Sequence, residues 1–473
     1  MSRFALTALV PVVGASLLAQ QGAAPSAELA EVVAGYAAKI VASAHFVSGR
    51  TLDSVLAEEL APTRPLEAMV RPLLQFDIDD KAGTVTCRIG SARATAVRTQ
   101  GLGCTLARPG ADAAALRARA IAAAPPAPAN VLQQPWPLGE GAATPTAGIN
   151  QAALARAIDN AFAEPRGQAK IHTRAVVVVH RGQLVAERYA PGYHAAMPLP
   201  GWSMTKTLTH ALLGVREQQA PLALHRPDDT GPGREWLRDE RRAISLDHVL
   251  TMTTGLAWNE SYDDPASNAL QMLFRSSDHA AAYIARPRAA APGATFGYSS
   301  GATNLLCQVL RATFAGDDAA YHAFPREHLF APLGMHSTVL ETDPSGTFVG
   351  SSYGFATARD WARLGLLYAQ GGEFAGKRLV RRQWIDDAFR PAPGSEGRFG
   401  RHLWLDADPD GDGPAKRRWP ELPADLGYMS GHEGQYCVIV PSAQLVLVRL
   451  GCTKNGGFDL RAFVRDVLTA TSK

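Results

Sequence analysis

The sequence predicts an α+β fold, in which an antiparallel sheet is flanked by helices and carries a helical subdomain. Strand-rich runs lie near both ends of the region that follows residue 149, and helical patterns and loops lie between them. No βα unit repeats along the chain, as a doubly wound parallel sheet would require. A small N-terminal α+β region is expected to precede this domain.

The first part of the chain predicts a separate unit. Residues 30–120 carry a helical pattern and then short strand-like pieces such as "GTVTCRIG". The Pro/Ala-rich tract 124–148 is poor in regular structure and is typical of a linker. We therefore expect an N-terminal region of unknown role at 25–123 and a second domain at 149–473.

The second domain begins and ends with clear local signals. An amphipathic helix, "INQAALARAIDNAFAE", precedes "AVVVVHRGQLVAERYA", which predicts a hairpin turning at Arg181-Gly182. Near the end, "QYCVIVPSAQLVLVRL" predicts a hairpin around Pro441–Gln444. A helix follows in "FDLRAFVRDVLTA", with an apolar face formed by Leu460, Phe463, Val464, Val467 and Leu468.

Composition narrows the function. With 46% hydrophobic and 19% charged residues the chain can bury a large core. The net charge is +3, and no Lys/Arg block interleaves with aromatics, which argues against a nucleic-acid partner. No stretch after the N-terminus approaches 18 uninterrupted apolar residues, so no membrane span is expected in the mature protein.

The N-terminus has the layout of a secretory signal. Arg3 precedes the apolar run 4–18, and small residues follow up to residue 24. A buried first helix is the alternative, but Pro11 and Gly14 interrupt it. We therefore expect residues 1–24 to be removed and the protein to be exported, to the periplasm or beyond.

Export permits disulfides, and the chain has five cysteines. Cys87 and Cys104 are the nearest pair within one strand-rich region, which predicts a bridge between them. No cysteine has a CxxC or metal-ligand spacing. The other three, Cys307, Cys437 and Cys452, are expected to be small buried residues.

The stretch "GWSMTKT" at 201–207 contains a serine three positions before a lysine. Apolar residues recur at helical spacing from Met204, so Ser203 begins a helix, where unpaired N–H groups favour a developing oxyanion. Lys206 returns to nearly the same face, and a buried amine loses its proton more easily. The alternative is an ordinary capping serine beside a solvated lysine.

Two further motifs follow in order. Tyr298-Ser299-Ser300 lies 95 residues after Ser203, and His432-Glu433-Gly434 opens an expected strand. Together the three motifs resemble those of the serine β-lactamase and penicillin-binding-protein superfamily. The resemblance covers roughly residues 150–473. It is closest to the class C β-lactamase-like branch, which includes D,D-peptidases, carboxylesterases and 6-aminohexanoate-dimer hydrolases.

The resemblance implies roles for the first two motifs. Ser203 would be the acylated nucleophile, and Lys206 and Tyr298 would share its proton traffic. Either of these two could be the base. Ser300 would complete the hydrogen-bond network, and no cofactor or metal would be needed.

The resemblance also implies a binding wall. On a strand, His432 and Gly434 would face the cleft, and Gly434 would let substrate approach the backbone. The backbone N–H groups of Ser203 and Gln435 would form the oxyanion hole. Tyr262 would overhang the pocket, or would simply be a packing residue.

His432 stands where β-lactamases place a lysine that holds the substrate carboxylate. This departure favours a small-molecule ester or amide as substrate, as in the 6-aminohexanoate-dimer hydrolase and carboxylesterase types. The alternatives are a β-lactamase or D,D-peptidase acting on cell-wall-type substrates, and a non-catalytic sensor or ligand-binding module of the same fold. The oligomeric state stays open.

Two rival motifs are weaker. "GSSYG" at 350–354 matches a nucleophile elbow centred on Ser352, but no buried strand is expected before it. His210 and His248 lie in helical patterns and are expected to be core or capping residues.

In "DADPDGDGPAKR", the spacing of Asp406, Asp408, Asp410 and Gly411 is similar to that of a calcium-binding loop. Position twelve is Arg417 instead of Glu, so a solvated acidic turn is expected.

Overall fold

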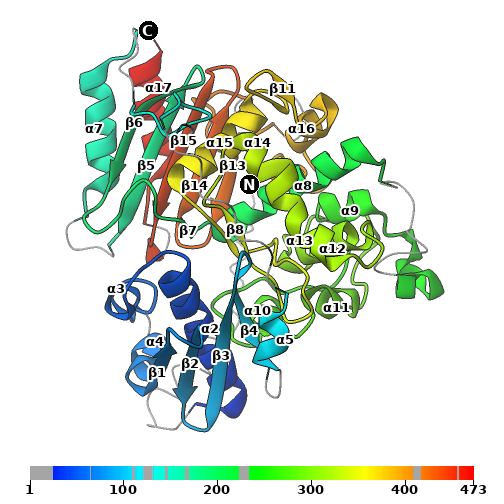
Figure 1. The fold of residues 1–473 in the computed structure, drawn as a ribbon. Coiled ribbons are helices and arrows are strands. Elements are labelled where there is room, and N and C mark those ends of the chain that lie inside the picture. The colour runs from blue at the N-terminus through cyan, green and yellow to red at the C-terminus, as the bar shows by residue number, and fades with distance from the viewer. Residues whose placement is uncertain are drawn as a thin grey trace, which may run out of the picture.

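The computed structural model describes residues 25–63, 65–108, 112–119, 121, 130, 133–143, 148–165, 170–222, 234–408, 417–454 and 457–472. The expected secretory signal, residues 124–129, 131–132 and 144–147 of the expected linker, and Asp410-Gly411 lie outside the described residues. None of the described helices is long and apolar enough to cross a membrane. The fold class is confirmed: antiparallel sheets and helices build the molecule, and a small α+β unit comes first (Figure 1).

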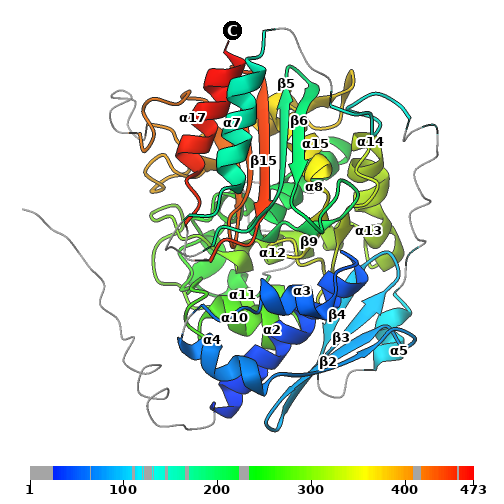
Figure 2. The same cartoon turned by 90° about the vertical axis from the view of Figure 1, so that its left-hand side faces the viewer.

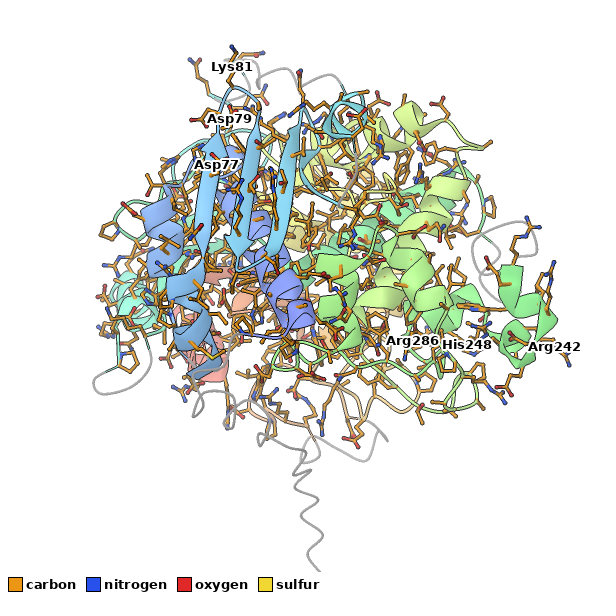
Figure 3. All side chains as sticks on the ribbon, turned by 90° about the horizontal axis from the view of Figure 1, so that it is seen from below. Asp77, Asp79, Lys81, Arg242, His248 and Arg286 are labelled. Atoms are coloured by element: carbon orange, nitrogen blue, oxygen red, sulfur yellow. The ribbon has the colours of Figure 1, made fainter. Side chains whose placement is uncertain are left out.

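The N-terminal unit is one long helix laid on a four-stranded antiparallel sheet of order β1-β2-β3-β4. Its elements are α2 (Ala27–Phe46), α3 (Leu52–Ala57), α4 (Pro65–Val70), β1 (Gln75–Asp79), β2 (Thr84–Ile89), β3 (Ala92–Thr99), β4 (Gly103–Ala107) and α5 (Ala113–Arg117). Ser26 caps α2 by accepting from Leu29 N at 3.2 Å. In the view from below, Asp77, Asp79 and Lys81 mark one end of this sheet, and helices of the second domain lie beside it (Figure 3).

The main sheet has six strands in the order β12-β13-β14-β15-β5-β6. They are β5 (Thr173–His180), β6 (Gln183–Tyr189), β12 (Trp404–Leu405), β13 (Gly427–Gly431), β14 (Gln435–Val440) and β15 (Leu445–Gly451). Both hairpins expected from the sequence are present. Arg181 and Gly182 have φ of 50° and 74°, the left-handed pair that a two-residue hairpin turn needs. Since β15 pairs with β5, the two ends of the domain close one sheet.

Helices cover both faces of this sheet (Figure 2). On one face, α7 (Gln151–Phe162) and α17 (Leu460–Thr471) pack on Val176 and Val178. On the other face, α15 (Ala358–Ala369) packs on Val177 and Val179. Neighbouring residues of β5 thus enter different cores, which is why the strand reads as one continuous apolar run.

The helical subdomain lies beside the α15 face. Its helices are α8 (Thr205–Gln219), α9 (Leu246–Leu250), α10 (Asn268–Arg275), α11 (His279–Ile284), α12 (Ser300–Ala312), α13 (Asp318–Pro325), α14 (Ala331–Leu333) and α16 (Arg382–Ala388). Short 3₁₀ turns at Trp202–Met204, Arg234–Arg238 and Glu240–Ala243, and a π turn at Arg326–Phe330, join them. The small strands are β7 (Leu199–Pro200), β8 (Val339–Leu340) and β9 (Gly354–Ala356), with β10 (Glu373–Phe374) and β11 (Lys377–Arg378) apart from them.

Buried charges attach the N-terminal unit to the second domain. Lys39 of α2 forms a short ion pair with Glu341, whose carboxylate also accepts from Cys104 N at 2.7 Å. Arg174 of β5 pairs with Glu59 at 2.7 Å. Buried ion pairs tolerate little misalignment, so the two parts are held in one arrangement.

The expected Cys87–Cys104 bridge is wrong. All five cysteines are free and buried. Cys87 lies on β2 and Cys104 on β4, and β3 runs between them. Adjacent strands are about 4.8 Å apart, so two residues separated by a whole strand cannot form a disulfide.

Candidate active site

Ser203 lies on a tight turn at the entry to α8, as the sequence predicted. The 3₁₀ turn Trp202–Met204 leads directly into the helix, and Trp202 has a φ of 48°. Gly201 is required here because a Cβ atom would lie 2.1 Å from the Trp361 ring. Ser203 is only partly buried, while its neighbours in the chain are buried. The serine hydroxyl is therefore presented on a rigid and otherwise enclosed segment.

Lys206 is 2% exposed and its ammonium has three partners. Nζ lies 3.0 Å from each of Ser203 Oγ, Ser300 Oγ and the carbonyl oxygen of Ser351. Burial lowers the pKa of Lys206 to about 8, and the charge of Glu260 opposes that shift. The Ser203–Lys206–Ser300 group thus comes together as expected, and it contains a lysine able to lose its proton near neutral pH.

Glu260 was not expected from the sequence. Its carboxylate accepts a short hydrogen bond from Ser300 Oγ, one from Ser300 N at 2.8 Å and one from the Trp258 indole at 2.6 Å. Nothing in "AWNESYDDP" marks this glutamate, because the loop meets α12 only in the folded chain. It fixes the direction of the Ser300 hydroxyl.

That direction orients the lysine. The Ser300 hydroxyl donates its hydrogen bond to Glu260, so its oxygen accepts from Lys206, and the Ser351 carbonyl can only accept. A neutral amine has two hydrogens and one lone pair. With both hydrogens committed, the lone pair points at the Ser203 hydroxyl, which is the arrangement of a general base.

Tyr298 faces the same lysine. Lys206 Nζ lies 4.9 Å from its ring centroid, and the ring stacks on Trp404 with centroids 5.1 Å apart. Burial, and then the charge of Glu260, raise the pKa of Tyr298, although hydrogen bonding with Ser203 opposes this. The phenol is therefore protonated at neutral pH, as an ordinary tyrosine is, and the raised pKa makes it a weaker acid than an exposed tyrosine.

The third motif is placed differently from expectation. His432, Glu433 and Gly434 form the turn between β13 and β14, so strand alternation does not apply to them. The left-handed φ values of Glu433 (59°) and Gly434 (81°) make this tight turn possible. A Cβ atom on Gly434 would lie 2.7 Å from Arg449, so this glycine packs closely against that side chain.

His432 does lie beside residues 201–204, which carry the expected nucleophile Ser203 and are called the nucleophile segment below. Its ring stacks on Tyr262 with centroids 4.7 Å apart and meets Trp202 edge-on at 5.3 Å. Tyr262 also meets Trp202 edge-on at 6.3 Å. Three aromatic rings thus form one wall next to Ser203, which supports placing both His432 and Tyr262 at the site.

Gln435 is held by the sheet, and Gly431 is the residue that lies beside the Ser203 turn. Gln435 begins β14, an inner strand between β13 and β15, and its side chain binds Gly451 O at 2.6 Å and Gly451 N at 3.0 Å. Gly431, at the end of β13, lies so near the nucleophile segment that a Cβ atom would be 2.2 Å from Gly201 O. Gly431 is therefore the residue of this motif region whose backbone packs directly on the backbone beside Ser203.

The rival motifs do not form separate sites. Ser352 sits in a buried turn without a preceding strand, and its neighbour Ser351 serves the site through its carbonyl. Asp406 forms a buried ion pair with Arg417 at 3.0 Å. His248 caps α9 together with Ser245, and His210 is buried against Trp384. Among the described residues, no cluster of histidine, cysteine and carboxylate side chains is suited to hold a metal.

Fold and site define a serine hydrolase of the type in which a lysine, one helical turn from the serine, faces its hydroxyl. The chain belongs to the β-lactamase family, whose family model, described as "Beta-lactamase", matches residues 158–470.

Comparisons with individual proteins agree with this assignment. The chain is 26% identical over 304 residues to the 6-aminohexanoate-dimer hydrolase of Paenarthrobacter ureafaciens, covering 59% of this chain and 72% of that one. A Bacillus anthracis protein provisionally assigned as a 6-aminohexanoate-dimer hydrolase has a similar structure (TM-score 0.52, 23% identity, 74% of this chain and 86% of that chain). A family VIII carboxylesterase also shares the fold (TM-score 0.51, 13% identity, 70% and 98%).

Proposed function

We propose that the protein hydrolyses an ester or amide through an acyl-enzyme on Ser203. The observation that carries the proposal is the hydrogen-bond arrangement of Lys206, which leaves the lone pair of the neutral amine for the serine hydroxyl. Tyr298, held protonated by burial, is assigned as the acid. This division of roles makes Lys206 the base, a choice that the sequence left open.

The chemistry then runs in two stages. Ser203 Oγ bonds to the substrate carbonyl carbon while its proton passes to Lys206. The bond to the leaving group breaks as that group takes a proton from Tyr298, which Lys206 replaces. Water then attacks the acyl-enzyme, its proton passes to the same pair, and the acid product leaves with Ser203 restored.

The oxyanion would be held by two backbone N–H groups. The first is that of Ser203, at the start of α8. For the second we assign His432 and not Gln435, because Gly431 is the residue whose backbone borders Gly201. Gln435 begins β14 and is paired with Gly431 across the turn.

An acyl chain without a carboxylate is the one that suits the wall of the site. Where β-lactamases have a lysine for the substrate carboxylate, this chain has His432 stacked on Tyr262. The similarity to a 6-aminohexanoate-dimer hydrolase supports linear amides, and the similarity to a carboxylesterase supports short esters. A β-lactamase, a D,D-peptidase or a non-catalytic sensor of the same fold is the second candidate.

Labelling tests the nucleophile. A fluorophosphonate probe followed by peptide mass spectrometry is expected to modify Ser203, and Ser203→Ala is expected to remove the label. Ser352→Ala is the matched control, since it deletes a buried hydroxyl nearby. Labelling that persists in Ser203→Ala would place the nucleophile elsewhere.

Turnover tests the substrate class. We expect sustained hydrolysis of p-nitrophenyl butyrate or of linear 6-aminohexanoate dimer, and much slower hydrolysis of nitrocefin and of a D-Ala-D-Ala peptide. A burst that stops after one equivalent would instead indicate a sensor. Preference for nitrocefin or the peptide would support the cell-wall alternative.

We also propose export, from the signal-like pattern of residues 1–24. Expression of the chain with residues 1–24 in place, followed by cell fractionation and N-terminal sequencing of the product, tests this. Recovery of the cytoplasmic protein with residues 1–24 attached would refute it.

A further inference from the structure

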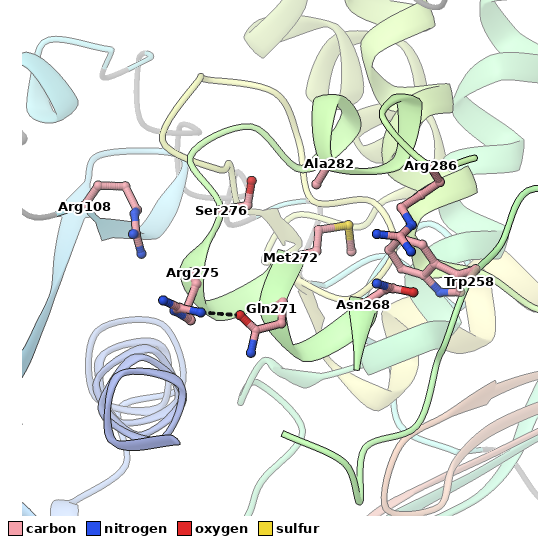
Figure 4. Close-up of a pocket in the computed structure, with 9 residues that line it drawn as sticks. All are labelled: Arg108, Trp258, Asn268, Gln271, Met272, Arg275, Ser276, Ala282 and Arg286. Atoms are coloured by element: carbon pink, nitrogen blue, oxygen red, sulfur yellow. Dashed lines mark hydrogen bonds between the residues drawn. The ribbon is translucent and has the colours of Figure 1, made fainter. Parts of the chain in front are cut away.

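A cavity lies between the N-terminal unit and the helical subdomain (Figure 4). Its volume is about 330 Å³. Arg108, which follows β4, lines one side, and residues of α10 and α11 line the other. Trp258 and Arg286 form its far end in the same view.

Three guanidinium groups line this cavity, and among the described residues only one of them forms ion pairs with carboxylates. Arg275 binds Glu28 at 2.8 Å and Glu31 at 2.9 Å. Arg108 has no hydrogen bond or ion pair to any described residue; burial and the charge of Arg275 lower its pKa, and the charge of Glu31 opposes that shift. Arg286 uses only Nε, which donates to Ala257 O at 3.1 Å.

The cavity therefore presents donors without acceptors. Within the part of the chain that the structure describes, the terminal nitrogens of Arg108 and Arg286 donate to nothing. A planar guanidinium matches a carboxylate with two parallel hydrogen bonds, and an anion would relieve the repulsion between Arg108 and Arg275.

The rest of the lining suits an organic molecule. Trp258 and Met272 give apolar surface, and Gln271 and Asn268 add amides. A volume of this size is at the small end of ligand pockets and exceeds what a single inorganic ion fills. We propose that this cavity binds a small carboxylate with an aromatic or apolar body.

The cavity shares a wall with the active site. Trp258, which lines it, donates its indole N–H to Glu260 at 2.6 Å, and Glu260 holds Ser300 beside Lys206. A ligand packed on Trp258 thus lies one hydrogen bond from the residue that orients the catalytic lysine. This site is independent of which ester or amide the enzyme hydrolyses.

Calorimetric titration of the full chain carrying Ser203→Ala tests the proposal, with benzoate, benzamide and inorganic phosphate as probes. The Ser203→Ala background separates this site from turnover. Benzoate is expected to bind at millimolar concentration or tighter, and at least tenfold more tightly than benzamide or phosphate.

Variants then locate the site. Arg108→Gln is expected to weaken benzoate binding at least tenfold, and Ala282→Phe, which fills the cavity without changing charge, to abolish it. Arg93→Gln is the matched control, an exposed arginine of the same N-terminal unit, and should change binding less than twofold.

Each other result overturns a part of the proposal. Equal binding of benzamide would remove the role of charge, and equal binding of phosphate would remove the organic body. Benzoate binding that survives both Arg108→Gln and Ala282→Phe would place it elsewhere, and no binding at millimolar benzoate would refute the site.

Discussion

Replacing Glu260 with glutamine changes one charge near Lys206 and tests the assignment of the base. The carboxylate favours the ammonium form, since its charge raises the pKa of Lys206 against burial. Removing the charge should therefore lower the pKa of Lys206 below about 8. Lys206 must be neutral to accept a proton, so activity should appear at lower pH.

The size of the shift follows from the geometry. Lys206 and Glu260 are separated by two hydrogen bonds through Ser300, roughly 5 Å in total. Two unit charges at that distance interact by about 3 kcal/mol at an effective dielectric constant of about 20, equivalent to about two pKa units. Because Glu260 is partly exposed, solvent screening reduces the expected shift to about one unit.

The assay is kcat/KM for p-nitrophenyl butyrate between pH 5.5 and 10, which reports the free enzyme. In the parent enzyme the rate should rise with a midpoint near pH 8, as Lys206 loses its proton. In Glu260→Gln the midpoint should fall by about one unit. The plateau should also fall about tenfold, because Glu260 accepts hydrogen bonds at both carboxylate oxygens and the amide nitrogen that replaces one of them can only donate.

Glu240→Gln is the matched control. Glu240 is an exposed carboxylate paired with Arg288 at 2.6 Å, and its loss should leave the profile unchanged. A midpoint in Glu260→Gln that stays in place or moves upward would refute Lys206 as the titrating base. If instead the midpoint of the pH profile moves in Tyr298→Phe, the titrating base is the phenol of Tyr298 and not Lys206.

Three further outcomes are expected. Gly431→Ala should abolish esterase activity while the protein still folds, because the added methyl group would lie 2.2 Å from Gly201 O; full kcat in this variant would contradict the close approach. Lys39→Met should lower the free energy of unfolding in urea by about 3–5 kcal/mol, since it leaves the Glu341 carboxyl group buried without its partner, and restoration by adding Glu341→Gln would identify the ion pair as the cause. Finally, thiol titration in denaturant without reductant should find five thiols, and fewer would indicate a disulfide.

The motifs that could be predicted are those whose members are close in sequence. Ser203 and Lys206 are one helical turn apart, so helix geometry alone brings the amine to the hydroxyl. The hairpin at Arg181-Gly182 follows from the apolar runs on both sides and a turn that accepts left-handed backbone. The local structure of these two segments depends little on the rest of the chain.

The third motif shows where local rules stop. The run "YMSGHEGQYCVIV" contains two short strands and their turn, and the sequence alone placed His432 and Gly434 on one strand. A shift of the turn by a few residues exchanges the face of every side chain. As a result, Gly434 faces Arg449, while Gly431 takes the position against the nucleophile segment.

The sequence by itself determined that Ser203 and Lys206 meet at the start of one helix, and it determined the two long hairpins, the helix at the end and the class of fold, because each is encoded by periodicity or by residues one turn apart. Only the tertiary structure decided that Glu260 directs Ser300, that Cys87 and Cys104 lie two strands apart, and that Arg108 meets α10. These contacts join segments separated by tens to hundreds of residues. No local pattern records them, because they form only when packing brings distant surfaces together.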